Sequence, residues 1–347
     1  MASVYRVGSF NIQKFGRKSM LKKDIKGIAD IIKSNKLDIV AIQEISNKEA
    51  LKEIMKCLDG TIISEGIPGN SNARDVFSCE TSNWEGRWAK PISYIGGKNA
   101  EEGYAFIWLK RRIELPVNKY RKKSEPDIYL IGGKTIRPPF CGRFLVKSCN
   151  AEIRLINTHI IFRKNPIEDA DMEEEESTAT DYEERLKEYR VLANEIYQRV
   201  YIKNIGTRQV VTFILGDYNM CLQESNSLDK KAIMPLDVER LKYGRHIIKT
   251  IQNQKTTIRG KSRKNPEMIY CGEENLANNY DHFSYEEKLE NSLVIHSRRL
   301  DAECLYRGKY QDIRDVNGNN MRNEYEAYRT LISDHLPIMM SIAFTKR

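Results

Sequence analysis

The amino-acid sequence predicts a mixed α/β protein in which β-sheets pack face to face and helices cover the outside. Segments with strand character alternate with segments whose apolar residues recur at helical spacing along the 347-residue chain. Hydrophobic residues make up 40% of the chain, which is enough for a sizeable core. Because no internal repeat and no linker rich in Pro, Gly or Ser divides the sequence, we expect residues 1–347 to form a single domain.

The N-terminal part alternates strand, helix, strand and helix. Val4–Ile12 predicts a buried strand, and Ser19 can cap a helix whose apolar stripe is formed by Leu21, Ile25, Ile28 and Ile32. Leu37–Ile45 predicts a second strand, which carries a carboxylate near its end. Ser46–Glu49 has the pattern of a capping box, and the helix that it opens turns inward Leu51, Ile54, Met55 and Leu58.

Strands predominate after this point. They are expected at Gly103–Leu109, Ile128–Ile131, Phe144–Cys149, Glu152–Ile161, Gln209–Leu215, Ser292–His296 and Pro337–Phe344. The third and fourth of these strands are placed to form a hairpin. A second capping box, Thr180–Glu183, opens a helix whose apolar face is formed by Leu186, Tyr189, Ala193, Ile196, Tyr197 and Val200.

Several classes of protein are unlike this sequence. The longest apolar run, Leu336–Phe344, is about half the length that a membrane span needs. The N-terminus begins with a strand-like run and lacks the apolar core of a signal peptide. The seven cysteines form no CxxC pair, which is typical of reduced thiols. We therefore expect a cytoplasmic or otherwise intracellular protein without a membrane span.

The charge of the chain is positive and unevenly distributed. Lys and Arg number 57 against 48 Asp and Glu, a net charge of +9. Glu168–Glu188 contains eleven acidic and two basic residues, a net of −9, so the rest of the chain carries +18. Such a balance favours a polyanionic partner such as nucleic acid, phosphoinositide or anionic membrane. The acidic insertion around residues 165–180 is either a solvated loop or a flap over a basic groove.

Polar side chains gather at the ends of the predicted strands, where a rigid scaffold presents reactive groups. Acids, asparagines and two histidines in such places suit a hard cation and a phosphate. These residues are Asn11, Glu44, His159, Asp217, Asn219, Asp334 and His335.

The same residues lie in five motifs whose order along the chain resembles the endonuclease/exonuclease/phosphatase superfamily. The motifs are Phe10-Asn11-Ile12-Gln13, Ile42-Gln43-Glu44, Asn157-Thr158-His159, Gly216-Asp217-Tyr218-Asn219 and Ser333-Asp334-His335-Leu336-Pro337. They span residues 10 to 337, and the resemblance therefore covers nearly the whole chain. It implies a four-layer α/β (α+β) sandwich of two packed mixed β-sheets flanked by helices on both outer faces.

Further motifs resemble the DNase I-like branch of this superfamily. Glu102, Tyr104 and Phe106 match an E-x-Y-x-F strand whose glutamate pairs with the histidine at the position of His159. Tyr280-Asp281 resembles the Y-D pair before the last catalytic strand, and Arg137 lies in a loop resembling one that meets substrate phosphate. The chain lacks the W-C-D-R motif of inositol polyphosphate 5-phosphatases and the N-x-D or N-x-N start of AP endonucleases.

These resemblances and the chemistry of the side chains imply roles at a Mg²⁺ site, with Mn²⁺ as an alternative ion. Glu44 is the expected main metal ligand, supported by Asn11 and Asp334, because Mg²⁺ takes one or two carboxylates and keeps several waters. Asp217 is expected to orient or deprotonate the attacking water, and Asn219 to donate to a phosphate oxygen.

The two histidines are expected to move protons. His335, oriented by Asp281, is a general base or a donor in the transition state. His159, held by Glu102, protonates the leaving oxygen. Tyr104 either hydrogen-bonds a phosphate or belongs to the core. The basic run Arg259–Lys264 is equally compatible with a groove contact and a solvated loop.

We therefore predict a metal-dependent phosphodiesterase, a DNase I-like nuclease that leaves a 3′-hydroxyl and a 5′-phosphate, with DNA favoured over RNA as partner. One alternative is a phosphoinositide phosphatase or sphingomyelinase-like phosphodiesterase of the same superfamily. The other is a non-catalytic nucleic-acid-binding module, although a binder has no need of both imidazoles.

Overall fold

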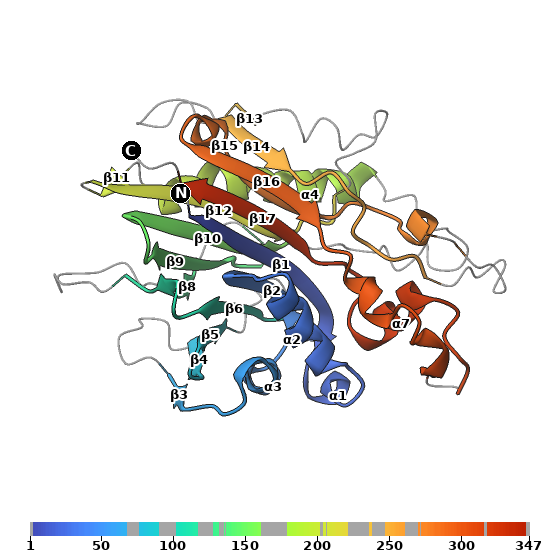
Figure 1. Cartoon of the computed structure of the whole chain (residues 1–347). Coiled ribbons are helices and arrows are strands. Elements are labelled where there is room, and N and C mark those ends of the chain that lie inside the picture. Colours follow the sequence, from blue (N-terminus) through green and yellow to red (C-terminus); the bar gives the residue numbers. More distant parts are fainter. Residues whose placement is uncertain are drawn as a thin grey trace.

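Two β-sheets face each other, with helices on the outer face of each (Figure 1). The computed structural model describes residues 3–67, 76–89, 102–116, 128–131, 135, 137–160, 179–201, 204–205, 207–220, 236–237, 247–260, 270, 272–315 and 318–344. Among these residues, no helix has the length and the apolar character needed to cross a membrane.

The first sheet has eight strands and mixes parallel and antiparallel neighbours. Its order is β16 (Leu293–Arg299), β17 (Ile338–Phe344), β1 (Val4–Phe15), β2 (Ile39–Ile45), β6 (Tyr104–Leu109), β5 (Trp84–Ala89), β4 (Val76–Glu80) and β3 (Ser64–Gly66). Strands β1 and β2 run parallel, whereas β1 is antiparallel to β17 and β2 is antiparallel to β6.

The second sheet is also mixed and has nine strands. Its order is β13 (Leu236–Asp237), β14 (Ile247–Ile251), β15 (Asp281–Glu286), β12 (Arg208–Asp217), β10 (Ala151–His159), β9 (Phe140–Val146) and β7 (Ile113–Glu114), while β11 (Asn204–Ile205) pairs with β12 and β8 (Ile128–Leu130) with β9. Strands β10 and β12 are parallel, and the predicted hairpin is confirmed as β9 and β10.

Apolar side chains fill the space between the sheets. Phe106 of the first sheet stacks on Phe140 of the second, with ring centroids 5.1 Å apart, and packs edge-on against Phe144 at 5.3 Å. Such aromatic pairs bury large areas and hold the two sheets at a fixed spacing.

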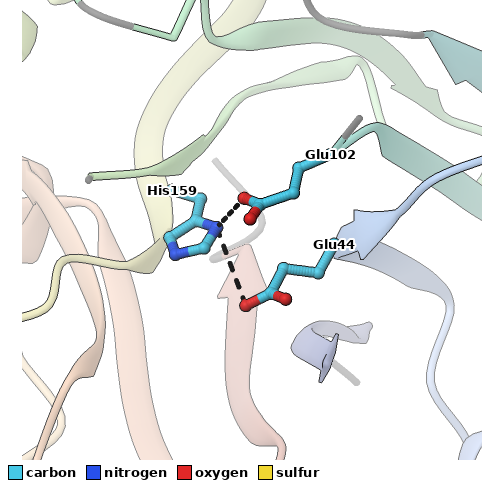
Figure 2. Close-up of side chains that lie close together, drawn as sticks. All are labelled: Glu44, Glu102 and His159. Carbon is cyan, nitrogen blue, oxygen red and sulfur yellow. Dashed lines mark ion pairs between the residues drawn. The ribbon is translucent and has the colours of Figure 1, made fainter. Parts of the chain in front are cut away.

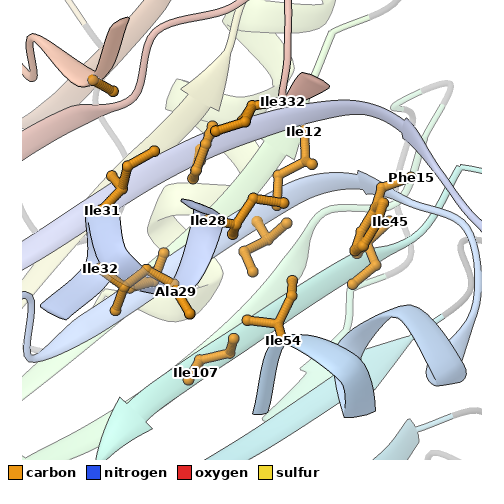
Figure 3. Close-up of a cluster of buried hydrophobic side chains, with 14 of the residues drawn as sticks. Ile12, Phe15, Ile28, Ala29, Ile31, Ile32, Ile45, Ile54, Ile107 and Ile332 are labelled. Carbon is orange, nitrogen blue, oxygen red and sulfur yellow. The ribbon is translucent and has the colours of Figure 1, made fainter. Parts of the chain in front are cut away.

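Helices cover the outer faces. On the first sheet lie α1 (Arg17–Met20), α2 (Ile25–Ser34), α3 (Lys48–Asp59) and α7 (Glu324–Leu331). The buried residues of α2, α3 and α7 form one cluster with the sheet (Figure 3), and the half-buried Met20 of α1 packs against it. On the second lie α4 (Ala179–Val191), the π-helical turn η1 (Leu192–Ile196) and α5 (Tyr197–Val200). Short 3₁₀ turns complete the chain at Gly272–Asn275, Glu287–Asn291, Ala302–Tyr306 and Tyr310–Asp312. The predicted four-layer sandwich is thus confirmed.

Two predicted helix caps are wrong by a few residues. Ser19 lies inside α1, and α2 is capped by Asp24, whose carboxylate accepts the N–H of Gly27 at 2.8 Å. Leu21 consequently lies outside the helix and is 91% exposed instead of facing the core. For α3 the cap is Asn47 and not Ser46, because the hydroxyl of Ser46 donates to the carbonyl of Phe15 instead.

The helix predicted after residue 180 is present as α4, η1 and α5, and its expected apolar face is buried against the second sheet. The acidic insertion around residues 165–180 falls almost entirely outside the described residues, as does most of the basic run Arg259–Lys264.

The strand directions bring one set of ends to the same edge of the sandwich. The carboxyl ends of β1, β2, β10 and β12 meet there with the amino ends of the antiparallel strands β6, β15 and β17. All the strand-end polar residues of the sequence motifs therefore gather at one edge.

Candidate active site

Sheet register places three of the expected site residues in one row. In the second sheet, His159 is paired with Asp217 across the parallel strands β10 and β12. Asp217 is in turn paired with Asp281 across the antiparallel strands β12 and β15. Neighbouring strands lie about 4.8 Å apart, so their side chains share one small region.

The first sheet supplies the residues that face this row from the other side of the site. The side-chain amide of Asn11 donates to Glu44 Oε1 at 2.9 Å and to Asp217 Oδ2 at 3.0 Å, which links the two sheets. The second oxygen of Glu44 accepts the backbone N–H of Lys14 at 2.9 Å. Asn11 is thereby fixed between two carboxylates.

Backbone strain accompanies this arrangement. Six described non-glycine residues have positive φ angles, and four of them belong to the site or its rim: Gln13 (41°), Lys14 (49°), Glu44 (58°) and Asn219 (49°). The other two, Lys36 (52°) and Gln252 (80°), lie outside it. Such angles cost about 1–3 kcal/mol each and persist only where the surroundings impose them. The surroundings therefore constrain the backbone at several positions along this edge.

Both imidazoles point toward the same carboxylate oxygen. His159 Nε2 lies 3.5 Å from Asp217 Oδ2, and His335 Nε2 lies 3.6 Å from it. On the far side of each ring stands another carboxylate. Asp281 Oδ2 is 2.8 Å from Nδ1 of His335, and Glu102 Oε2 is 3.2 Å from Nδ1 of His159. The expected pairs are therefore in contact.

These charges shift the protonation of the buried groups. Burial lowers the pKa of His335, but the carboxylates of Asp281 and Asp217 outweigh burial and raise it well above its ordinary value. Burial raises the pKa of Asp217 to about 6, although the two imidazoles act in the opposite direction. A carboxyl with such a pKa is a better proton acceptor near neutral pH than an ordinary aspartate.

His159 is held in a denser set of charges. Burial and the Arg137 guanidinium lower its pKa, yet the carboxylates around it, Glu102 foremost, raise the pKa overall. Burial acts to raise the pKa of Glu102, and the neighbouring His159 and Arg137 more than compensate, so that it is lowered. The pair is thus biased toward imidazolium and carboxylate.

Figure 2 shows Glu44 and Glu102 approaching the same ring nitrogen of His159 from two sides. Nδ1 of His159 lies 3.9 Å from Glu44 Oε1, and one donor atom from each of the three residues falls within 4.8 Å of the others. Two carboxylates and an imidazole form a donor set that suits a divalent cation. With His159 neutral, these three residues fit a metal ion, and Glu44, the expected main ligand, is one of them.

The other two expected metal ligands are placed differently. Asn11 touches Glu44 through its amide nitrogen, while its Oδ1 accepts the backbone N–H of Gln13 at 2.9 Å. Asp334 Oδ2 accepts Nε2 of Gln13 at 2.7 Å. Neither belongs to the three-residue group around His159, so the structure brings Glu102 and His159 to Glu44 more closely than the sequence predicted.

Arg137 and Tyr104 lie behind the imidazole. Arg137 Nη1 is 2.6 Å from Glu102 Oε2 and 2.8 Å from Nδ1 of His159. Tyr104 is 1% exposed, and its hydroxyl accepts the backbone N–H of His159 at 3.0 Å. Of the two readings of Tyr104, the structure places it in the interior, in contact with the site through His159.

Asn219 and Gly216 shape the turn that carries Asp217. The backbone N–H of Asn219 donates to Asp217 Oδ1 at 2.8 Å, and its side-chain amide donates to the carbonyl of Ile160 at 2.8 Å. Gly216 has a φ of +140°, and a Cβ there would collide with the carbonyl oxygen of Thr158. The glycine of the G-D-x-N motif is thus required by backbone geometry.

Sequence reasoning missed several side chains that support the site. Gln43 Nε2 donates to Asn157 Oδ1 at 2.6 Å and so joins the two sheets near the row of His159, Asp217 and Asp281. Ser333 Oγ donates to the carbonyl of Asn11 at 2.7 Å. Gln43, Asn157 and Ser333 all lie within the quoted motifs, which was the available signal. Lys23 lies near the site but belongs to none of these motifs. Burial lowers the pKa of Lys23 to about 8, although the nearby Asp334 and Glu44 carboxylates act in the opposite direction.

Comparison by sequence finds no matching family model and no matching curated protein. Comparison by structure finds an endonuclease/exonuclease/phosphatase family protein from Bacteroides thetaiotaomicron, at 14% identity and a TM-score of 0.55 over 100% of both chains. TDP2 from D. rerio, complexed with single strand DNA product, matches at 14% identity and a TM-score of 0.50, over 98% of this chain and 99% of that one.

A mannosyl-6-phosphatase from Bacteroides thetaiotaomicron matches at 14% identity and a TM-score of 0.50, over 98% of this chain and 100% of the other. The chain therefore has the fold of the endonuclease/exonuclease/phosphatase proteins, and the resemblance drawn from its motifs is confirmed at the level of fold. Proteins with different substrates share this fold, so the reaction has to be argued from the site itself.

Proposed function

We propose that this protein is a metal-dependent phosphodiesterase that hydrolyses nucleic acid, with DNA as the favoured substrate. The observation that carries the proposal is the convergence of two carboxylate-held imidazoles on Asp217 Oδ2, at 3.5 and 3.6 Å. Two proton-carrying rings around one carboxylate suit a reaction in which a water is activated and an oxygen leaves.

Each residue has a place in that reaction. Asp217, with its raised pKa, orients the water and takes its proton. His335, kept cationic by Asp281, donates from Nε2 to a non-bridging phosphate oxygen, and His159 protonates the leaving oxygen. Asn219 has a second amide hydrogen for phosphate beyond the one given to Ile160. Asn11 holds Asp217 and Glu44 in register.

Glu44, Glu102 and His159 are the residues that would hold the metal ion. A bound Mg²⁺ or Mn²⁺ would neutralise charge on the phosphate in the transition state. His159 would fill one of two roles, either as a neutral ligand of the metal ion or as the cation that protonates the leaving oxygen.

Charge supports a nucleic-acid substrate. Outside Glu168–Glu188 the chain carries +18, and a polyanion gains most from such a surface. A protein of the same fold, TDP2 from D. rerio, has been crystallised with a single strand DNA product. DNA is therefore the first substrate to test.

The test is hydrolysis of supercoiled plasmid, single-stranded DNA, RNA and phosphoinositide, each with Mg²⁺, Mn²⁺ or EDTA. We expect cleavage of DNA with either metal, none with EDTA, and 5′-phosphate and 3′-hydroxyl ends. Glu44→Gln should abolish cleavage and weaken Mn²⁺ binding measured by calorimetry. Turnover of phosphoinositide alone would assign the lipid phosphatase reaction instead, and nucleic-acid binding without any hydrolysis would leave a binding module.

A further inference from the structure

A second polar cavity adjoins the candidate active site. Its volume is about 230 Å³, and it lies between α7, the segment around residues 258–260 and the turn at residues 272–275. Gln13 lines this cavity and also donates its side-chain amide to Asp334 at 2.7 Å. The side chain of Gln13 thus belongs both to the wall of this cavity and to the candidate active site.

Backbone contacts join the cavity to the active-site loop as well. The N–H of Ile258, a lining residue, donates to the carbonyl of Asp334 at 2.7 Å. The preceding Thr257 forms a bridge with His335. The cavity is therefore tied to the loop that carries Asp334 and His335, and a molecule bound in it would lie on that side of the candidate active site.

The cavity is basic. Three arginines, Arg259, Arg322 and Arg329, line it together with one acid, Glu326. Arg322 Nε is 3.0 Å from Glu326 Oε2, so this pair is internally neutralised. Two positive charges remain, on Arg259 and Arg329, and among the described residues that line the cavity Glu326 is the only acid.

Those two guanidinium groups are anchored by backbone carbonyls. Arg259 Nε donates to the carbonyl of Glu274 at 3.1 Å, and Arg329 Nη1 donates to the carbonyl of Ile258. A guanidinium carries five N–H donors in a rigid fork, so one anchoring bond leaves donors with a fixed direction. Fixed guanidinium forks are well suited to phosphate oxygens.

An aromatic ring and a small residue complete the site. The guanidinium of Arg259 stands over the ring of Tyr270, 5.7 Å from its centroid, which further restrains it. Gly260 lies against Arg329, where an added Cβ would come within 3.4 Å of Nη2. The absence of a side chain at Gly260 keeps the approach to this guanidinium open.

We propose that this cavity binds a second phosphate of the substrate, next to the one that is hydrolysed. The inference rests on the proposed function and narrows it: the substrate carries at least two phosphate groups, as a polynucleotide does. The first two residues of the basic run Arg259–Lys264 then act as a phosphate subsite, and Gln13 joins the two phosphate positions.

The test uses a trinucleotide whose two linkages can be made neutral one at a time by methylphosphonate substitution. The parent should cleave the fully charged substrate with a kcat/KM about tenfold above that of the substrate neutral at the flanking linkage, the usual size for loss of one charge-assisted contact. Arg259→Gln should lower kcat/KM for the charged substrate and erase this difference. Arg259→Lys should restore part of it.

Arg111→Gln is the matched control, because Arg111 is an exposed arginine in the turn after β6, at the opposite end of the sandwich. It removes the same charge and should keep the parental preference. The subsite would be overturned if Arg259→Gln kept the parental preference for the fully charged substrate. It would also be overturned if Arg259→Gln and Arg111→Gln lost the same amount of kcat/KM. Thermal unfolding of each variant separates a misfolded protein from one that has lost the contact.

A binding measurement keeps the two proposals separable. With hydrolysis blocked by Asp217→Asn, the trinucleotide should bind more weakly when Arg259 or Arg329 is replaced by Gln, whether or not the parent cleaves it. If the parent cleaves no substrate but this binding loss is found, the proposed function fails and the phosphate subsite stands. If cleavage is found without the binding loss, the subsite is wrong and the proposed function stands.

Discussion

Asp217 Oδ2 is the point on which both imidazoles converge, so the two rings should be needed together. We expect His159→Ala and His335→Ala each to reduce kcat about 10²–10⁴-fold, the usual effect of losing one positioned acid or base. Asp281→Asn should be milder, because this carboxylate touches the ring nitrogen of His335 that faces away from Asp217. Glu102→Gln should also be milder if Glu102 only positions His159, and should abolish metal-dependent cleavage if Glu102 holds the ion. Single-turnover rates measure the chemical step directly. Parental rates for His159→Ala on every substrate would contradict its assigned role.

Tyr104 offers a test of positioning against substrate binding. Its buried hydroxyl accepts the N–H of His159, so Tyr104→Phe leaves that N–H without its acceptor. We expect a loss of about 1–3 kcal/mol in the free energy of unfolding, measured in urea, and a fall in kcat. KM should stay near the parental value, because the side chain does not reach the open side of the site. A raised KM with unchanged stability would instead assign Tyr104 to phosphate binding.

At the level of single elements, β10 carries a buried ion cluster on the face turned away from the other sheet. Glu152 is fully buried, and its carboxylate oxygens lie 2.8 Å from Nε of Arg143, 2.8 Å from Nε of Arg154 and 3.2 Å from Arg208. Arg154, itself 1% exposed, also donates to the carbonyl of Val200 at 2.6 Å and so fastens α5 to the strand.

Removing the carboxylate would take away the negative charge that Arg143, Arg154 and Arg208 share. Glu152→Gln should lower the free energy of unfolding by about 3–5 kcal/mol. The exposed ion pair of Glu114 with Lys147 provides the matched control, and Glu114→Gln should cost at most about 1 kcal/mol. Urea unfolding at neutral pH measures both. Equal effects would show that the buried cluster contributes no more than a surface pair.

The pH dependence of this stability has a defined sign. Burial acts to raise the pKa of Glu152, but Arg143 and Arg154 prevail and lower it in the folded protein. A lowered folded-state pKa means that the stabilisation is complete above the unfolded-state value of about 4.3 and is lost as the pH falls through the folded-state value. The difference in the free energy of unfolding between the parent and Glu152→Gln should therefore become smaller below about pH 4.

Elements were predictable where the local pattern is strong. The apolar runs of β2, β10 and β12 identify buried strands, and their polar ends identify most of the site. Strand β14 and helix α7 escaped prediction, because IIKTI is short and EYEAYRTL has a weak apolar stripe. The caps of α2 and α3 were misplaced since two polar residues compete at each, and only a tertiary contact such as Ser46 with Phe15 decides between them.

Contacts between residues far apart along the chain lie beyond sequence reasoning for a physical reason. Gln13 and Asp334, or Tyr104 and His159, are far apart along the chain and meet only through strand register and sheet packing. The cavity with Arg259 and Arg329 is of the same kind, because its two guanidinium groups come from segments about 70 residues apart. Motif order predicted which residues form the site, and register decides which atoms face each other.

For the whole molecule, the distribution of charge predicts how binding responds to salt. The net charge is +9, and the part of the chain outside Glu168–Glu188 carries +18. Each phosphate that such a surface neutralises on a DNA duplex releases counterions and adds about −0.9 to the slope of log K against log salt. If DNA places one phosphate in the subsite and another at the catalytic position, the slope for duplex DNA should be about −1.8 or steeper.

Fluorescence anisotropy measures this slope without cleavage. It uses the Asp217→Asn variant and a labelled duplex at salt concentrations from about 50 to 200 mM. Arg259→Gln should reduce the magnitude of the slope by about 0.9, because one phosphate contact is lost. Arg111→Gln removes a charge at the far end of the sandwich, where solvent screens it, and should leave the slope nearly unchanged. A flat response in the parent would mean that the surface charge does not act on nucleic acid. The +18 would then have to serve solubility or a smaller anion, and the preference for DNA would lose its main physical support.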